Sequence, residues 1–335
     1  MAWSSVERFT DPHAAGAAVQ GAVIEVFPTA KGRFECEITK VRFDHLWMQK
    51  FHTTLPQVIT AEHKLGRRAI GFLTEPKSST LLHCGIEVLP GDVFLNRFDV
   101  IHQRSGHDLR SGAMSLPTKE LNAALKAITG RELPEKEQTN IVRPDPALMS
   151  RLLKLHKAVG QLAHDSPDIL ELPEVGRALE AQLAHLMVRC LADCAAVPIT
   201  TGDHRHDAIM SRFEKFLEAN PDRPLYLTEI CACIGVAERT LRGACEEHLG
   251  MGPIRYLTLR RMHLVRAALQ HADPAKSTVT RIVTNHGFWE LGRFSGAYRA
   301  LFGELPSETL RRPAERQSEP ERPLLLPANE ICRLN

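Results

Sequence analysis

The feature that most constrains the fold is a near-duplication within residues 226–303. In the first copy, apolar residues spaced at i, i+3, i+4 and i+7 stop at Gly235 and then resume. The second copy has the same spacing in Val279, Ile282, Val283 and His286, stops at Gly287 and resumes likewise. This periodicity predicts a short helix, a turn in which the glycine takes a positive φ, and a second helix. Any isolated pair of helices gives the same stripes, but their repetition favours two helix-turn-helix units in tandem. Two such units point to DNA.

A third helix is predicted between the copies, because Gly252-Pro253 places a proline in a favourable first turn and the helix can continue to about His271. At ~1.5 Å per residue it spans about 28 Å, close to the ~34 Å between successive major-groove faces on one side of B-DNA. Its polar face carries four arginines and no acidic residue, namely Arg255, Arg260, Arg261 and Arg266. We therefore expect a stiff connector, with Arg255 and Arg260 contacting phosphates.

Two runs of residues make the comparison more specific. The first is Gly250-Met-Gly-Pro253-Ile-Arg-Tyr256-Leu257, followed by Arg261-Met262, and the second extends from Gly287-Phe288 through Phe294, Ser295, Tyr298 and Phe302-Gly303 to Pro306-Ser307. They resemble the DNA-binding domain of the AraC/XylS family of bacterial transcription regulators over about residues 207–312. The resemblance implies a domain of two modules whose second helices enter adjacent major grooves.

The charge distribution agrees with this interpretation. Residues 239–313 carry twelve Arg or Lys and six acidic residues, a net charge of +6. Because the whole chain is only +2, the remainder carries −4. A basic segment that coincides with the duplicated motif is the expected electrostatic footprint of a phosphate-binding surface.

The second helix of each unit is predicted to contact DNA. The residues concerned are Glu238, Arg239, Thr240 and Arg242 in the first unit, and Leu291, Gly292, Arg293, Ser295 and Arg299 in the second. Arg239, Arg242 and Arg293 are the strongest candidates for reading bases, because a guanidinium can bind a guanine edge through two hydrogen bonds. A phosphate contact or a surface ion pair is the alternative for each.

Four positions depart from the family pattern. Tyr226 and Ala237 stand where a capping residue such as serine is common, and neither side chain can cap a helix through an oxygen. Gly243 and Gly296 stand where basic residues are usual. We expect the first unit, with two arginines, to supply most of the sequence discrimination, and the second mainly to position the protein.

The first 115 residues are organised differently. Short β-rich runs separated by Gly, Pro and Asp recur along this segment, which is typical of a sandwich or barrel. Residues 86–95 resemble the strand-turn-strand of cupin-like sensor domains. The predicted fold class is α+β: an amino-terminal cupin-like β-barrel with following helices, then an all-α carboxyl-terminal domain of two helix-turn-helix units joined by a linker helix.

Histidines are frequent in this segment, but no H-x-H pair occurs before residue 204. A metal-dependent cupin enzyme would need such a pair, so we predict no metal, no cofactor and no enzymatic activity. We expect instead a barrel that holds a small effector, with His45, His83 and His102 as candidate lining groups; surface or satisfied core histidines are the alternative. A cupin-type metalloenzyme fused to a DNA-binding domain and a ligand-independent DNA-binding protein remain alternative functions.

Cysteine spacing excludes another class. The chain has eight cysteines but no C-x-x-C pair. A DNA alkylation-repair regulator with this type of domain would need a four-cysteine zinc site near the amino terminus, where only Cys36 and Cys84 lie. Cys190 and Cys194 share a helix face at i, i+4, where reduced packing residues are favoured over a metal or redox site.

The predicted domains are a barrel over residues 1–116, a helical segment over 117–196, a linker over 197–206 that includes the His204-x-His206 pair, the DNA-binding domain over 207–313, and a disordered tail over 314–335. The helices of residues 145–195 have apolar faces that either close the sensor core or form a dimer interface. No stretch is long and apolar enough to span a membrane and no leader is recognised, so we expect a cytoplasmic protein.

The function expected from these features is that of a transcription regulator. A small molecule in the barrel is expected to shift the protein between states that differ in DNA binding. The expected partners are double-stranded promoter or operator DNA, RNA polymerase, the effector and a second copy of the chain. Family resemblance favours activation over repression.

Overall fold

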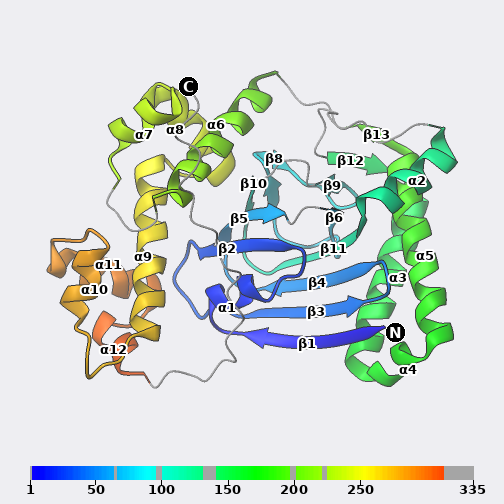
Figure 1. Ribbon diagram of the computed structural model, residues 1–335, viewed down its shortest axis with the longest axis horizontal. Helices are drawn as coiled ribbons and strands as arrows, with labels where there is room; N and C mark the ends of the chain where they lie inside the picture. Colours follow the sequence, from blue (N-terminus) through cyan, green and yellow to red (C-terminus); the bar gives the residue numbers. More distant parts are fainter. Residues whose placement is uncertain are drawn as a thin grey trace, which may run out of the picture.

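The structure is a computed structural model, and it describes residues 2–63, 66–95, 100–130, 141–196, 201–220 and 225–312. Strands fill the centre of the molecule, with one group of helices on either side (Figure 1). The predicted tail over residues 314–335 lies outside the described residues, as do residues 197–200 of the predicted linker. Among the described residues, no helix combines the length and apolar character that crossing a membrane requires.

Two antiparallel sheets form the amino-terminal half. The larger contains, in spatial order, β1 (Trp3–Phe9), β3 (Cys36–Arg42), β4 (Trp47–Thr53), β11 (Leu109–Pro117), β6 (Arg67–Leu73), β9 (Val93–Leu95), β12 (Ile141–Pro144) and β13 (Cys194–Ala196). The smaller contains β2 (Ala22–Pro28), β5 (Gln57–His63), β10 (Val100–Ser105), β7 (Leu81–His83) and β8 (Ile86–Glu87). Helix α1 (Pro12–Ala17) connects β1 to β2, and Asp11 caps it by accepting a hydrogen bond from the Ala14 amide.

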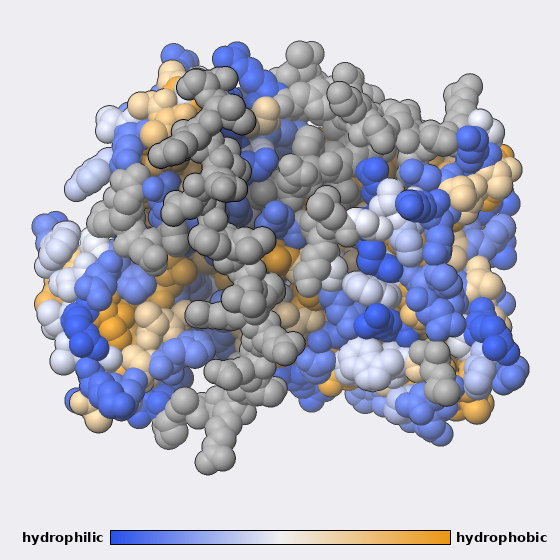
Figure 2. All heavy atoms as spheres, in the orientation of Figure 1, coloured by the Kyte–Doolittle hydropathy of each residue, from blue (hydrophilic) through white to orange (hydrophobic). Residues whose placement is uncertain are grey.

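The larger sheet is covered on its outer face by helices. These are α2 (Thr118–Thr129), α3 (Pro146–Asp165), α4 (Pro167–Glu171) and α5 (Pro173–Ala192). One apolar core joins Met48, Ile70 and Met114 of the sheet to Leu152 and Leu183 of α3 and α5. These apolar faces are therefore packed against the outer face of the larger sheet. The outward surface of these helices is largely hydrophilic (Figure 2).

Two boundaries predicted from the sequence are wrong. Residues 117–196 are not wholly helical, because β12 and β13 return to the sheet and pair with each other, and β12 also pairs with β9. The predicted linker over residues 197–206 is partly helical, since α6 (Thr201–Glu218) begins within it. The cause is tertiary: a four-residue strand and a helix start are stabilised by the elements on which they pack, not by local pattern.

The carboxyl-terminal half is all helical and contains both predicted units. After α6 come α7 (Leu227–Ile234), α8 (Glu238–Leu249), α9 (Pro253–His271), α10 (Val279–Asn285), α11 (Leu291–Phe302) and α12 (Pro306–Arg311). In Figure 1, α9 runs from α6, α7 and α8 at one end to α10, α11 and α12 at the other. Gly235 (φ 67°) and Gly287 (φ 78°) have the predicted left-handed conformation, and the Tyr226 and Ala237 side chains make no capping hydrogen bond, as predicted.

Candidate nucleic-acid interface and barrel cavity

The first unit presents the start of α8 to solvent. Leu241, Ala244 and Cys245 face inward and are fully buried, so the helix is held by one side while Arg239 and Arg242 lie exposed on the other. An Arg242 Nη2 atom donates to Glu238 Oε1 at 2.8 Å. Both side chains of this ion pair are exposed, and exposed ion pairs contribute little to stability. Its arginine can therefore exchange a carboxylate for a base or phosphate at small cost.

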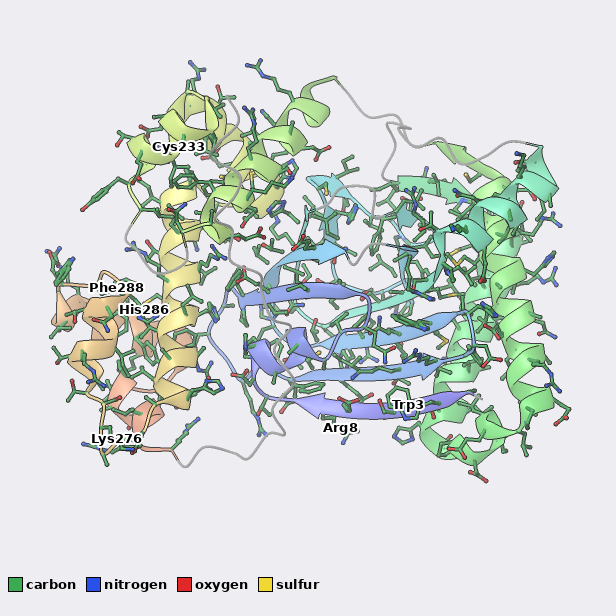
Figure 3. All side chains as sticks on the ribbon, in the orientation of Figure 1. Trp3, Arg8, Cys233, Lys276, His286 and Phe288 are labelled. Carbon is green, nitrogen blue, oxygen red and sulfur yellow. The ribbon has the colours of Figure 1, made fainter. Side chains whose placement is uncertain are left out.

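The second unit presents the start of α11 in the same way. Phe294 and Tyr298 are buried in its core, whereas Gly292, Arg293 and Arg299 are exposed and Leu291 and Ser295 are half-buried. Arg293 pairs with Glu290 at 2.7 Å in an exposed ion pair. The turn before this helix carries Phe288, which lies against the Arg261 guanidinium at 5.0 Å and is labelled in Figure 3 with His286 beside it.

Sequence reasoning missed Trp289. Its side chain is 74% exposed immediately before α11, at the end of the helix predicted to enter a groove. The position next to the anchoring Phe288 was the available signal. Because Trp289 lies beside the exposed start of α11, near Arg293 in sequence, it is a further candidate for the DNA face.

The connector α9 has the predicted bounds but not the predicted free basic face. Arg255 is exposed. Arg260 is not, because its side chain is 9% exposed and its guanidinium pairs with Glu25 of β2 at 3.0 Å. Arg266 lies 4.7 Å from the Phe302 ring and 3.5 Å from Glu304. In this arrangement Arg260 cannot contact a phosphate, since an acidic side chain of another domain occupies it. That correction could not be read from the helix pattern alone.

A cavity lies between the two sheets. Its volume is about 130 Å³. Aliphatic and aromatic side chains from β2, β3, β4, β5, β6, β10 and β11 line most of it. The polar lining consists mainly of glutamine, serine and threonine side chains, and Arg67 is the only charged residue among the lining residues. Such a pocket, mostly apolar with few polar groups, is typical of small-molecule sites.

The three histidines predicted to line this cavity lie elsewhere. His45 is exposed and pairs with Glu120 at 2.7 Å. His83 is buried, and its ring stacks on Phe94 at 4.7 Å instead of entering the cavity lining. His102 is buried on the opposite face of β10. Strand alternation explains this last result, because Ile101 and Gln103 on either side of it do line the cavity.

Arg67 is the lining residue that sequence reasoning missed. Its guanidinium lies 3.9 Å from the Trp47 ring centroid. It donates to the Ser115 hydroxyl at 3.2 Å and to the Ser115 carbonyl at 2.7 Å, and it also contacts the His45 carbonyl. Among the described residues it has no carboxylate partner within ion-pair distance. These bonds hold a cation in place at the Ser115 end of the cavity.

Among the described residues, no group of three or more His, Cys, Asp or Glu side chains is arranged to hold a metal ion. Burial raises the pKa of the Cys190 thiol to about 12, and the Cys194 thiol donates to the Leu191 carbonyl. His206 of the His204-x-His206 pair lies on α6, and its ring pairs with the Glu247 carboxylate at 2.7 Å.

Comparison with known proteins places these features. Residues 230–312 match the family model described as a helix-turn-helix domain. The chain is 41% identical over 96 residues to the probable thc operon regulatory protein of Rhodococcus erythropolis, which is 29% of each chain. It is 34% identical over 113 residues to XylDLEGF operon transcriptional activator 1 of Pseudomonas putida, 34% of each chain. The matched segment thus spans about a third of these relatives.

Among solved structures, ToxT from Vibrio cholerae is similar at 13% identity and a TM-score of 0.29, with 87% of this chain and 95% of that chain covered. The assignment rests on the family model, on the curated relatives and on the two helix-turn-helix units of the structure. The chain carries at its carboxyl-terminal end a double helix-turn-helix domain of the AraC/XylS type.

Proposed function

We propose that the protein is a sequence-specific DNA-binding transcription regulator whose activity depends on a small molecule bound in the barrel. The observation that carries this proposal is the pair of exposed, arginine-bearing helix starts on α8 and α11, joined by one rigid helix. Two matched relatives are named as operon regulators or activators, which favours activation and contact with RNA polymerase. The proposed homodimer stays a prediction, as does the cupin-like assignment of the barrel.

Base reading by the two units is tested by single substitutions. Arg239→Ala and Arg293→Ala are each expected to relax base preference at one half of the site, by roughly 5- to 150-fold per base pair, since a two-bond contact contributes ~1–3 kcal/mol of discrimination. The measurement is selection of bound sequences from a random duplex pool by the full chain and by each variant, followed by affinity measurement at fixed salt.

Arg255→Ala is the matched control, because this exposed arginine is assigned to a phosphate and should weaken all duplexes alike. If the Arg239 and Arg293 variants also weaken all duplexes alike, these arginines contact phosphate and the assignment is wrong. Selection of no sequence by the unsubstituted chain would contradict the proposed function itself.

The shape of the cavity restricts the effector. Lining residues follow β11 from Leu109 to Ser115, a length of about 20 Å at ~3.4 Å per residue. The walls between are mainly apolar, and Arg67, the one charged side chain among the described lining residues, stands at the Ser115 end. An elongated, largely apolar molecule with an anionic group at one end matches this arrangement, because a carboxylate can pair with the guanidinium while its chain displaces water from the apolar walls.

Ligand class is tested with dodecanoate and dodecanol, two probes that differ only in the head group. Trp47 lines the cavity, so its fluorescence in a Trp3→Phe/Trp289→Phe background reports binding. Arg67→Met is expected to lower dodecanoate affinity by about 10- to 150-fold, the ~1.5–3 kcal/mol typical of a hydrogen bond to a charged group, and to leave dodecanol unaffected.

Arg42→Met is the control, because Arg42 also lies over the Trp47 ring, at 5.0 Å, but does not line the cavity. An equal loss of affinity in both variants would assign the effect to Trp47 packing. Absence of binding by both probes would reject the proposed ligand class.

A further inference from the structure

One wall of the cavity is also the surface on which the DNA-binding half rests. This wall consists of the three neighbouring strands β2, β5 and β10. The residues that face the cavity are Ile24 and Val26 on β2, Ile59 and Ala61 on β5, and Ile101 and Gln103 on β10. Because side chains alternate along a strand, the residue between each pair faces away from the cavity. These intervening residues are Glu25, Thr60 and His102.

The three intervening residues form one row across the sheet. In the strand register, Thr60 lies directly opposite Glu25 on one side and directly opposite His102 on the other. We call Glu25, Thr60 and His102 the transverse row. Any displacement of these strands by a molecule in the cavity moves the whole row together, because backbone hydrogen bonds connect its members.

Each member of the row contacts the DNA-binding half. Glu25 accepts hydrogen bonds from Arg260 Nη2 at 3.0 and 3.2 Å. The Thr60 and Tyr256 hydroxyls are 3.1 Å apart. His102 Nε2 lies 3.1 Å from Glu214 Oε1. Tyr256 and Arg260 belong to α9 and Glu214 to α6, so the row contacts the helix that joins the two units and the helix that supports the first unit.

Two of the three contacts, those of Thr60 and His102, are buried and therefore sensitive to small displacements, whereas the Glu25 side chain is 37% exposed. Glu214 and Tyr256 are fully buried, and Thr60 and His102 are 5% and 2% exposed. A buried polar group that loses its partner suffers the full desolvation penalty, so such contacts are either made well or lost. Apolar packing of Phe27 and Val58 against Phe213 and Tyr256 surrounds them and excludes water. The contact therefore behaves as a two-state element instead of a continuously adjustable one.

We propose that the transverse row transmits occupancy of the cavity to the DNA-binding half; this inference rests on the proposed function. A molecule that displaces the cavity-facing side chains of β2, β5 and β10 shifts the row on the opposite face, weakens its bonds to α6 and α9, and so changes how the two units are held for DNA. Linkage then requires that DNA change the affinity for the molecule by the same factor.

The test is charge reversal at the Glu25–Arg260 pair in the full chain. The measured quantity is the coupling ratio, defined as the dissociation constant for a selected duplex without dodecanoate divided by that with saturating dodecanoate. The unsubstituted chain is expected to give a ratio that differs from one by about fivefold or more, a common size for coupling between sites. Glu25→Arg and Arg260→Glu should each bring the ratio within twofold of one, and the double variant should restore at least half of the logarithm of the original ratio.

Glu7→Arg is the matched control. Glu7 pairs with Lys40 at 2.8 Å, and the two side chains are 37% and 8% exposed, against 37% and 9% for Glu25 and Arg260. This pair lies on β1 and β3, outside the wall of β2, β5 and β10 that contacts the DNA-binding half. Its ratio should equal that of the unsubstituted chain. A ratio altered equally by Glu7→Arg and Glu25→Arg would mean that barrel stability, not the row, determines the coupling.

Two further variants keep the inference testable if the charge-reversal variants misfold or if dodecanoate does not bind. Thr60→Val removes one hydroxyl at nearly constant volume and should bring the ratio closer to one without introducing charge repulsion. Ala61→Leu fills part of the cavity next to Thr60. Without any added ligand, it should change the affinity for the duplex, but it should not do so in the Glu25→Arg background. If the chain binds a selected duplex and neither dodecanoate nor Ala61→Leu changes that affinity, the inference is wrong while DNA binding stands. If no duplex is selected, the proposed function fails and the inference with it.

Discussion

Tyr298→Ala is expected to unfold the second helix-turn-helix unit while the rest of the chain stays folded. Tyr298 is fully buried in the core of that unit, against Phe294 at 5.5 Å and Phe302 at 4.5 Å between ring centroids. Its hydroxyl lies 2.8 Å from that of Thr309 on α12. Truncating a buried aromatic residue typically costs ~3–5 kcal/mol, which is a large fraction of the stability of a unit this small.

The expected result in solution is a separate, early unfolding transition in urea and a loss of duplex affinity of at least about 100-fold, the equivalent of ~2.7 kcal/mol. Tyr298→Phe keeps the ring and removes only the hydroxyl, so it should cost ~1 kcal/mol. Tyr226→Ala, at a side chain that is 72% exposed, should change stability by less than about 0.5 kcal/mol. Equal effects of Tyr298→Phe and Tyr298→Ala would show that the hydroxyl pair, not the aromatic core, holds the unit together.

Acidification is expected to destabilise the protein between about pH 6.5 and pH 4. Burial lowers the pKa of His156 and of His263 from the ordinary 6.5 to about 4. His156 packs against Phe72, and its Nε2 lies 3.2 Å from the Gln49 carbonyl. Below pH 6.5 the histidines of the unfolded chain bind protons that those of the folded chain do not. The free energy of unfolding therefore decreases as the pH is lowered, until the folded histidines also protonate near pH 4.

The size of this effect follows from the shifts. At pH 5.5 each of the two histidines should lower the free energy of unfolding by about 1.3 kcal/mol relative to pH 7.5. The measurement is urea unfolding at both pH values. His156→Gln should remove about half of the difference that the two histidines produce, whereas His164→Gln, at an exposed position on the same helix, should leave it unchanged. A pH dependence that is identical in the two variants would exclude His156 as a source.

Local pattern was sufficient wherever an element is stabilised by its own sequence. The helix Pro253–His271 was predicted with its observed bounds, because a proline at its start and an apolar stripe specify it locally. The turns at Gly235 and Gly287 were predicted for a similar reason, since the left-handed conformation suits glycine. Strands β12 and β13 were not predicted, because they lie in the segment expected to be helical and depend on pairing with each other and with β9.

Side-chain roles were harder to predict than elements. Residues that act from a helix surface, such as Arg239 and Arg293, follow from helical period and lie exposed as expected. His45, His83 and His102 were selected by residue type and lie outside the cavity lining. Arg67 was overlooked because nothing adjacent in the sequence marks it; its position is defined by Trp47 and Ser115, which reach it only through strand pairing.

The sequence by itself determined the double helix-turn-helix domain, its connector and the faces that the second helix of each unit turns to solvent, because helical period and glycine turns are local properties of a chain. Only the tertiary structure decided which side chains line the barrel and how the two halves meet. Arg260 illustrates the difference: its helix was predicted correctly, yet its partner Glu25 lies 235 residues away. Contacts between distant segments depend on strand register and packing, and neither is encoded in a short pattern.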